Sequence, residues 1–401
     1  MRLPRAPWQE RPGLTELLAV LGADRGETRY VGGCVRDTLL GLPVQDVDLA
    51  TRLQPEEVIA CLRRAEIKAV PTGLAHGTVT AVVEGKPVEV TTLRRDVATD
   101  GRHATVAFTG DWAEDAARRD FTINALSADP KTLDVFDYFG GWSDVEQRLV
   151  RFIGDPLTRI AEDHLRILRF FRFHARFGRG APHAESLEAC TTRANDLMAL
   201  SRERIADELL KLLALADPTP TVALMVERNI LRPVVPEIGS DGVARLAELV
   251  RREAAAGLPG EALRRLAALL PADPEVASTV GTRLRLSNKA VKRLVSAAGR
   301  SNDEAVPTVL AYRIGREEAV DRLLLGSGDP QAAAAIRDWE RPRLLVSGGM
   351  LIEWGLAPGP VVAHTMQEVQ RRWAEAGFPA GQAEQHALAR AAVDEALNAS
   401  R

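Results

Sequence analysis

The chain has 401 residues, which suggests two or more domains at about 150 residues each, and 46% of the residues are hydrophobic, as in a globular protein. A net charge of −3 gives no general affinity for nucleic acid, and no run of about 18 apolar residues predicts a membrane span. The N-terminus lacks a signal-peptide pattern, and the three cysteines form no C-x-x-C pair, which argues against a disulfide framework or a cysteine-rich zinc site. A cytoplasmic location is the simplest setting, and no obligate protein partner is evident.

The first third of the chain mixes short strand-like runs with turns, and the rest is helical. The pattern predicts a helix at 35–40, a strand at 46–51, a hairpin at 78–93 and a short strand at 106–108. From Asp144 onward, Leu, Ala, Arg and Glu dominate, and prolines interrupt the helical pattern. We therefore expect an α+β fold: a small mixed-sheet head followed by a long all-helical arm.

A chemically suggestive group lies near the start of the head. Gly32-Gly33 opens a helix, so backbone N–H groups there can approach a phosphate, and Arg36 one turn later can reach the same anion. Asp46 and Asp48 are two residues apart on an expected strand, so their side chains share one face. Two such carboxylates repel each other unless a cation lies between them, and oxygen ligands suit Mg²⁺ on a nucleoside triphosphate. The alternative is a structural turn followed by two solvated carboxylates.

These residues resemble the signature of the class II tRNA nucleotidyltransferase (CCA-adding enzyme) and bacterial poly(A) polymerase family. Four further motifs of that family match in order, so the resemblance spans about residues 28–215. The matching segments are 32–51, 118–125, 137–141, 162–169 and 201–211. The resemblance implies a polymerase-beta-like nucleotidyltransferase head at 1–143, a helical neck for base recognition at 144–215, and a helical, tRNA-binding body and tail at 216–401.

The segment from Glu162 onward has a periodicity of its own. Acidic and basic residues recur every three or four positions, which places them on one helix face; they are Asp163, Arg166, Arg169, Arg172 and Arg176. One interpretation is a salt-bridged surface helix with a Glu162–Arg166 pair. The other is that an Asp acceptor and an Arg donor together match the edge of a base. The family resemblance implies the second, with Asp163 and Arg166 reading the base and Arg169 and Arg172 helping to bind the nucleotide.

The resemblance also implies the chemistry. The 3′ hydroxyl of an RNA attacks the α-phosphate of CTP or ATP, and Asp46 and Asp48 are the catalytic residues and the Mg²⁺ ligands. Gly33, Arg36 and Arg119 are expected to bind the nucleotide. Glu89, on a strand expected to neighbour the Asp pair, is a candidate third carboxylate.

Three alternatives remain open. A poly(A) polymerase or an A-adding partial enzyme shares these motifs, although residues 387–401 lack the strong basic character of a poly(A) polymerase extension. The segment 93–107 resembles the flexible head loop of complete or A-adding enzymes, which disfavours a CC-only enzyme. From another class, a non-catalytic RNA-binding relative would be expected to lose Asp46 or Asp48, and both are present.

One stretch of the arm departs from the acidic average. Residues 281–300 contain six basic residues and no acidic one. Such a run is either a solvated helix face or a contact with a phosphate backbone. On the second interpretation, the residues predicted to contact RNA are Arg283, Lys289, Lys292 and Arg293.

Overall fold

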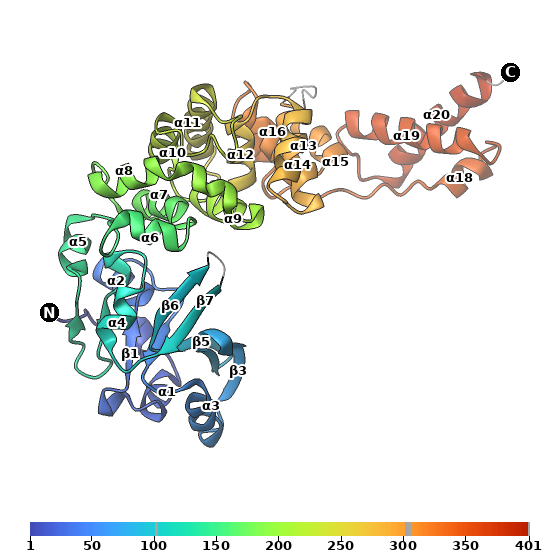
Figure 1. Ribbon diagram of the computed structural model, residues 1–401. Helices are drawn as coiled ribbons and strands as arrows, with labels where there is room; N and C mark the ends of the chain where they lie inside the picture. The colour runs from blue at the N-terminus through green and yellow to red at the C-terminus, as the bar shows by residue number, and fades with distance from the viewer. Residues whose placement is uncertain (101–102, 301–305, 400–401) are drawn as a thin grey trace. The chain divides into compact units, whose positions relative to one another are not determined.

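The computed structural model describes residues 1–100, 103–300 and 306–399, and for 96–100 and 103–106 it describes the backbone alone. The chain divides into two compact units, Met1–Ile238 and Gly239–Arg401. The first unit begins with a mixed sheet and continues as helices, and the second is helical (Figure 1). The predicted α+β class, a sheet-containing head followed by an all-helical arm, is confirmed. No helix within the described ranges is both long and apolar enough to cross a membrane.

A seven-stranded sheet forms the head, in the order β3-β4-β5-β2-β1-β8-β9. Its strands are β1 (Thr28–Val31), β2 (Asp48–Thr51), β3 (Lys68–Gly73), β4 (Thr78–Val83), β5 (Lys86–Thr92), β8 (Ser127–Ala128) and β9 (Val135–Phe136). The predicted hairpin is β4–β5, which turns through Glu84 and Gly85 with φ values of 48° and 73°. The pair β2–β5 is parallel, with Asp48 directly opposite Glu89, and this register brings two carboxylates to the same place on the sheet.

Helices pack on the sheet and connect its strands. They are α1 (Leu14–Val20), α2 (Gly33–Leu39), α3 (Pro55–Arg64), α4 (Trp112–Ala117) and α5 (Gly141–Gln147). Leu14, Leu17, Leu49 and Val90 are fully buried in the head core, as their apolar periodicity requires. The predicted helix at 35–40 is α2, which starts two residues earlier than expected.

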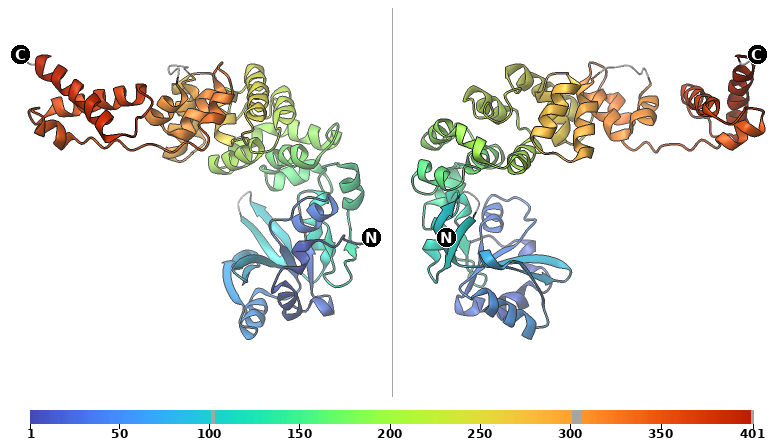
Figure 2. Two further views of the ribbon diagram at one scale, coloured as in Figure 1. Left: turned by 180° about the vertical axis from the view of Figure 1, so that it is seen from behind. Right: turned by 45° about the vertical axis from the view of Figure 1, so that its right-hand side comes forward.

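A separate two-stranded ribbon projects from the head, as Figure 2 shows from behind. It consists of β6 (Arg94–Asp100) and β7 (His103–Phe108), paired antiparallel. This ribbon occupies the segment that resembles the family's flexible head loop. Gly101 and Arg102, which belong to that predicted loop, lie outside the described residues.

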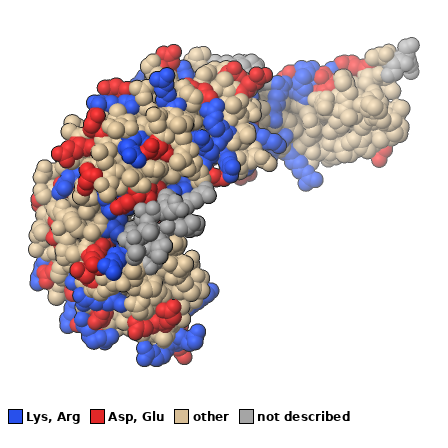
Figure 3. All heavy atoms as spheres, viewed as in Figure 1, with Lys and Arg blue, Asp and Glu red and all other residues tan. Residues whose placement is uncertain are grey.

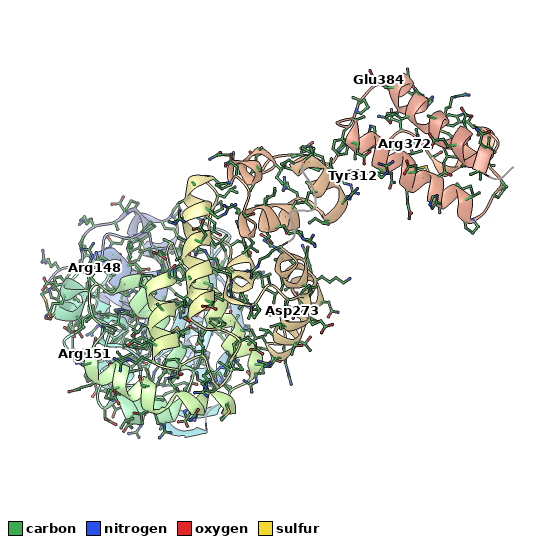
Figure 4. The ribbon with its side chains drawn as sticks, turned by 90° about the horizontal axis from the view of Figure 1, so that it is seen from above. Arg148, Arg151, Asp273, Tyr312, Arg372 and Glu384 are labelled. Carbon is green, nitrogen blue, oxygen red and sulfur yellow. The ribbon has the colours of Figure 1, made fainter. Side chains whose placement is uncertain are left out.

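The head passes into the helical part through a turn held by one carboxylate. Asp137 accepts hydrogen bonds from the backbone N–H groups of Phe139, Gly141 and Trp142 at 2.9–3.1 Å, and so fixes the start of α5. Arg151, labelled in Figure 4, pairs with buried Asp144 of α5 at 2.7 Å. The same guanidinium donates to the carbonyl of Phe139 at 3.0 Å, so this turn is braced from both sides.

The helical part of the first unit packs on the head through aromatic rings. Its helices are α6 (Pro156–Glu162), α7 (Arg166–Phe177), α8 (Ala184–Thr192), α9 (Arg202–Leu213) and α10 (Thr219–Glu227). The ring of Phe121, in the head, lies 5.1 Å from that of Phe173 on α7 and 5.0 Å from that of Phe152. These buried rings fix α7 over the second head motif.

One predicted detail of this region is wrong. Asp163 does not share a helix face with Arg166, because α6 ends at Glu162 and Asp163 has extended backbone angles (φ −153°, ψ 107°). Its short carboxylate instead accepts a hydrogen bond from the backbone N–H of Leu165 at 3.1 Å, ahead of α7. Short acidic side chains compete for backbone groups in this way, which favours helix boundaries over helix interiors.

The second unit is a stack of helices with a buried ionic group. The helices are α11 (Ser240–Ala255), α12 (Ala262–Leu269), α13 (Pro274–Arg283), α14 (Asn288–Ala298), α15 (Pro307–Ile314), α16 (Arg316–Leu325), α17 (Gln331–Ala335), α18 (Gly348–Glu353), α19 (Pro360–Glu375) and α20 (Gln382–Ala399). Glu253, Arg264, Arg265 and Asp321 are all buried and connect α11, α12 and α16 by ion pairs.

The last three helices of this unit have an apolar core of their own. Buried Leu351, Val369 and Val393 form that core, and the ring of Tyr312 on α15 contacts Trp373 on α19 at 5.7 Å (Figure 4). Arg372, on α19, bridges to Glu395 on α20. The predicted boundaries of the head at 143 and of the neck at 215 stay predictions.

Candidate active site

A cleft of about 550 Å³ in the first unit gathers most of the predicted site residues. From the prediction it is lined by Gly33, Arg36, Asp48, Arg119, Asp163, Arg166 and Arg169; its other lining residues are Gly32, Arg94, Arg118, Asp120, Asn124 and Phe173. Six of the thirteen lining residues are arginines and three are aspartates, so the cleft suits a polyanion that carries a cation.

The Gly-Gly turn forms one wall of this cleft. Gly32 has φ 65° and ψ −119°, a conformation available essentially to glycine, and a Cβ there would lie 3.0 Å from Nη1 of Arg119. At Gly33 a Cβ would meet nothing closer than 3.7 Å. Gly32 is therefore the glycine that the backbone requires, whereas Gly33 is the first residue of α2 and lines the cleft.

Arg36 is buried at the bottom of the same wall. It pairs with Asp37 at 2.6 Å, donates to the side chain of Asn124, and lies over the ring of Phe177 at 4.1 Å. Burial lowers the pKa of the Arg36 guanidinium, while the Asp37 charge acts in the opposite direction. A fixed, partly desolvated guanidinium of this kind attracts an anionic ligand strongly, because little water is present to screen its charge.

Of the three predicted carboxylates, Asp48 is affected by the negative charges of the other two, Asp46 and Glu89. Asp48 begins β2 and is half-buried, and Glu89 lies opposite it on β5, whereas Asp46 precedes the strand and is exposed. The expectation that the strand includes Asp46 is thus wrong, because β2 starts two residues later. Burial, followed by the negative charges of Glu89 and Asp46, raises the pKa of Asp48 to about 6, although Arg119 and Arg36 act to lower it. Of the three, Asp48 alone lines the cleft.

These carboxylates fit a divalent cation only when further ligands complete its coordination shell. Within the described residues, no group of three or more His, Cys, Asp or Glu side chains is gathered closely enough to hold a metal ion. The charge repulsion on Asp48 is the kind that a bound cation relieves. Mg²⁺ is commonly bound by one or two carboxylates together with substrate phosphates and water, so the oxygen donors present fit such an ion when a triphosphate supplies the remaining ligands.

Both candidate base-reading side chains, which also line the cleft, are already bonded to protein groups. Asp163 accepts from Arg204 of α9 at 2.7 Å. Arg166 pairs with Glu162 and donates to the carbonyl of Arg159 at 2.8 Å. The Glu162–Arg166 pair expected for a salt-bridged helix is therefore present, and Arg166 nevertheless lines the cleft.

Two buried carboxylates orient the next arginines along α7. Asp120, 8% exposed, accepts from Nε and Nη2 of Arg169 at 2.9 and 2.5 Å. Glu208 on α9, 3% exposed, accepts from Nε of Arg172 at 2.6 Å and lies 3.6 Å from Arg169. Burial acts to raise the pKa of the Asp120 carboxyl, but the Arg169 charge and several hydrogen bonds outweigh it and hold that pKa below its usual range. Arg172 does not line the cleft and lies behind Arg169.

Arg119 does not pair with its sequence neighbour Asp120. Its sequence neighbour Asp120 belongs to Arg169, and Arg119 instead donates to Asp115 on α4 at 3.2 Å. Arg118 and Asn124 lie inside the second head motif and line the cleft, yet only Arg119 was singled out from the sequence. Arg94 and Phe173 also line it, and no sequence pattern assigned them to a site.

The four predicted RNA contacts lie in the second unit, whereas the cleft belongs to the first. Lys289 and Lys292 are exposed on α14, in the region where Figure 3 shows basic side chains gathered on the surface. Arg283 ends α13 and is partly buried. Arg293 is mostly buried and donates to Asp321 at 2.6 and 3.0 Å and pairs with Glu261 at 3.1 Å, so its charge serves the ionic group between helices.

Comparison with protein families places these features in a known group. The family model described as "Poly A polymerase head domain" matches residues 28–151, and the one described as "Probable RNA and SrmB- binding site of polymerase A" matches residues 181–241. The mitochondrial CCA tRNA nucleotidyltransferase 1 of Mus musculus is 34% identical over 386 residues, covering 91% of this chain and 87% of its own. The CCA-adding enzyme of Geobacillus thermodenitrificans is 33% identical over 391 residues, 92% of this chain and 93% of its own.

Solved structures give the same result for the fold. The Bacillus stearothermophilus CCA-adding enzyme in complex with CTP matches with a TM-score of 0.74 and 27% identity, over 97% of this chain and 100% of that one. The Thermotoga maritima CCA-adding enzyme complexed with tRNA-CCA matches in fold, with a TM-score of 0.65 and 19% identity, over 97% and 95% of the chains. The sheet-containing head thus has the nucleotidyltransferase fold. The chain belongs to the family of CCA tRNA nucleotidyltransferases, also called CCA-adding enzymes.

Proposed function

We propose that this protein adds CCA to the 3′ end of tRNA from CTP and ATP, without a nucleic-acid template, and releases pyrophosphate. The observation that carries the proposal is a single cleft lined by two groups of candidate side chains. Asp48, Gly33 and Arg36 suit a triphosphate with a metal ion, and Asp163 and Arg166 suit a base. Addition of a defined nucleotide without a template requires the protein to hold the triphosphate and to select the base, and the family membership supports C and A as the selected bases.

Different side chains of the cleft bind the triphosphate and the metal ion. Arg36 and the N–H groups at the start of α2 bind the triphosphate, and Arg119, which lies next to Gly32, adds a second guanidinium. Asp46 and Asp48 would hold Mg²⁺ together with the triphosphate, and the bound ion would supply charge neutralisation and lower the pKa of the attacking 3′ hydroxyl. Because the pKa of Asp48 is raised to about 6, its carboxylate is half ionised near pH 6 in the protein alone and largely ionised only above about pH 7.

The base is read by protein groups. Asp163 offers acceptor oxygens and Arg166 donor N–H groups, which together can match the amino group and ring nitrogen of C or A. Asp120 and Glu208 hold Arg169 and Arg172 in place beside them. The exposed basic residues of α14 in the second unit are proposed to contact the tRNA backbone, which suits recognition of A-form RNA by shape and phosphate.

The cytoplasmic location and the exact metal belong to this proposal as well. Relatives named as mitochondrial exist in the family, so the compartment stays a prediction for this chain. Magnesium is proposed because the available donors are carboxylate oxygens, with phosphate oxygens as their natural complement.

One assay tests the function. The protein is incubated with Mg²⁺ and tRNA transcripts ending before C74, after C74 or after C75, with CTP alone, ATP alone or both, and the 3′ ends are sequenced. The expected products are CC with CTP alone on the shortest transcript, A with ATP alone on the longest, and CCA with both. A product of A-only additions or of long A tracts would instead establish a partial A-adding enzyme or a poly(A) polymerase. No extension of any transcript would favour a non-catalytic RNA-binding relative.

A further inference from the structure

One buried carboxylate, Asp115, contacts three residues of the cleft wall without lining the cleft itself. It lies on α4, and its side chain is 4% exposed. Its Oδ1 accepts from Nε of Arg118 at 2.8 Å, and its Oδ2 accepts from Nη2 of Arg119 at 3.2 Å. The same Oδ1 also accepts from the backbone N–H of Arg94, the first residue of β6, at 3.3 Å. All three partners line the cleft.

The two arginines need such a carboxylate between them. They are consecutive residues whose side chains are only 16% and 20% exposed, so their positive charges repel each other with little screening from water. Burial acts to raise the pKa of Asp115, but the Arg119 and Arg118 charges outweigh burial and lower it. A permanently ionised Asp115 thus holds both guanidinium groups at fixed positions.

Arg119 has a competing partner within the cleft. Its charge acts on Asp48, where it opposes the rise in pKa that burial and Glu89 cause. Without Asp115, Arg119 is drawn toward Asp48, the carboxylate proposed to hold the metal. The triphosphate would then lose a positioned donor, and the metal site would gain a rival cation.

The third contact extends the effect to the β6–β7 ribbon. Arg94 is fixed twice at the base of this ribbon, by its backbone N–H on Asp115 and by its guanidinium on the carbonyl of His76. The backbone of Leu93, the preceding residue, is bonded to Thr51 of β2 at 2.8 Å. Asp115 therefore connects the start of the ribbon, and through it the central sheet, to the paired arginines.

We propose that Asp115 is a positioning residue that holds Arg118 and Arg119 against the bound nucleoside triphosphate and aligns them with the base of the β6–β7 ribbon. The proposal rests on the proposed function, in that it takes a nucleoside triphosphate as the ligand of this cleft. It assigns Asp115 no contact with substrate: the residue acts through Arg119 above all.

The test is a double-mutant cycle read by nucleotide binding. The equilibrium Kd of CTP with Mg²⁺, and of ATP with Mg²⁺, is measured in the absence of RNA for wild type, Asp115→Asn, Arg119→Ala and the double variant. Asp115→Asn should weaken both nucleotides about ten-fold in the wild-type background and less than two-fold in the Arg119→Ala background. In extension assays, Asp115→Asn should raise KM by a similar factor and leave kcat at saturating nucleotide within about three-fold. Glu114→Gln, one residue away on α4 with an exposed side chain, is the matched control and should leave both Kd values unchanged.

Two results would overturn the proposal. One is an equal loss of affinity in both backgrounds, which would mean that Asp115 does not act through Arg119. The other is unchanged nucleotide affinity with a lowered melting temperature, which would make Asp115 purely structural. If Asp115→Asn does not fold, Asp115→Glu keeps the charge but displaces the oxygens, and the same cycle applies to it. A wild-type protein that binds CTP and ATP yet extends no tRNA would refute the proposed function while leaving this cycle interpretable.

Discussion

Asp163, in the break between α6 and α7, accepts a hydrogen bond at 2.7 Å from Arg204, which lies 41 residues further along the chain on α9. The carboxylate that the sequence predicts to read a base is thereby oriented by a helix that packs against α7 rather than by its own helix. This arrangement leaves the second oxygen on the backbone N–H of Leu165 and turns the group toward the cleft.

The first prediction concerns base selection by Asp163 and Arg166. Asp163→Ala and Arg166→Ala should each reduce the preference for CTP and ATP over UTP and GTP by ten- to a hundred-fold. The reason is that each lost hydrogen bond to a charged group costs about 1.5–3 kcal/mol. The measurement is kcat/KM for each of the four nucleotides on tRNA lacking its terminal residues.

Glu162→Gln is the control for this pair. It removes the ion-pair partner of Arg166 but no proposed base contact, so it should slow all four nucleotides in proportion. If the ratios between nucleotides keep their wild-type values in both alanine variants, the two residues only stiffen the helix junction, and base reading by this pair is wrong.

The second prediction is that Asp48→Asn abolishes nucleotide addition but stabilises the protein in the absence of nucleotide and metal. The pKa of Asp48 is raised from 3.8 to about 6, so the folded state binds a proton more tightly than the unfolded state. Ionised Asp48 therefore costs stability, and the cost grows as the pH rises from about 4 to about 6. The gain in the Asn variant should be small near pH 4 and reach about 3 kcal/mol above pH 7.

Urea unfolding at pH 4 and at pH 7.5 measures this gain. Adding Mg²⁺ with CTP should reverse the order at pH 7.5, because ligand binding stabilises the wild type and the variant has lost a metal ligand. Asp46→Asn, at the exposed neighbouring carboxylate, should also lose activity but gain less stability. A variant no more stable than wild type at pH 7.5 would mean that Asp48 is not strained by its neighbours.

The third prediction concerns Glu208, which holds Arg172 and approaches Arg169. Glu208→Gln leaves Arg172 without its buried counter-charge and leaves Arg169 with Asp120 alone, so it should destabilise the protein by about 3 kcal/mol. It should also raise KM for both nucleotides about ten-fold, because Arg169 at the cleft wall loses one of its two carboxylates. Thermal unfolding and steady-state kinetics measure the two effects.

Asp207→Asn is the matched control on the same helix. Asp207 forms an exposed pair with Lys211, and such pairs contribute little, so its loss should cost under about 0.5 kcal/mol and leave KM unchanged. Equal effects from the two substitutions would show that Glu208 has no special role in orienting the arginines.

Local patterns in the sequence were sufficient for much of the fold. The glycine pair before α2, the alternating residues of the β4–β5 hairpin and the helical arm all depend on neighbouring residues, and the structure contains them. The positions of Gly33, Arg36, Asp48 and Asp163 on one cleft followed from a resemblance to ordered family motifs rather than from periodicity.

The pairing of side chains across the cleft could not be predicted in the same way. Asp120 pairs with Arg169 and not with the adjacent Arg119, and Asp115 takes Arg119 instead. The Asp120–Arg169 pair spans 49 residues and forms only when α7 packs on the head, whereas Asp115 and Arg119 are four residues apart and pair locally. The same limit explains Arg293, whose charge looked available in a basic run but is matched by Asp321 from α16.

The last prediction separates the two kinds of basic residue in this run. Lys289 and Lys292 are exposed on α14, whereas Arg293, in the same helix, is bonded to Asp321 and Glu261. Lys289→Gln with Lys292→Gln should weaken binding of every tRNA at low salt and make the slope of log affinity against log salt shallower by about one to two units, because each lost phosphate contact releases one counterion fewer. The melting temperature of this double lysine variant should stay near that of wild type.

Arg293→Met should have the opposite pair of effects. The salt slope should be retained at temperatures where the protein is folded, and the melting temperature should fall by several degrees because buried Asp321 loses its closest counter-charge. Arg283→Gln, at the end of α13, tests the remaining predicted contact by the same slope. An unchanged slope in the double lysine variant would mean that the exposed face of α14 is solvated and that tRNA is held elsewhere; a shallower slope in Arg293→Met would mean that its ion pairs open to let the guanidinium reach RNA.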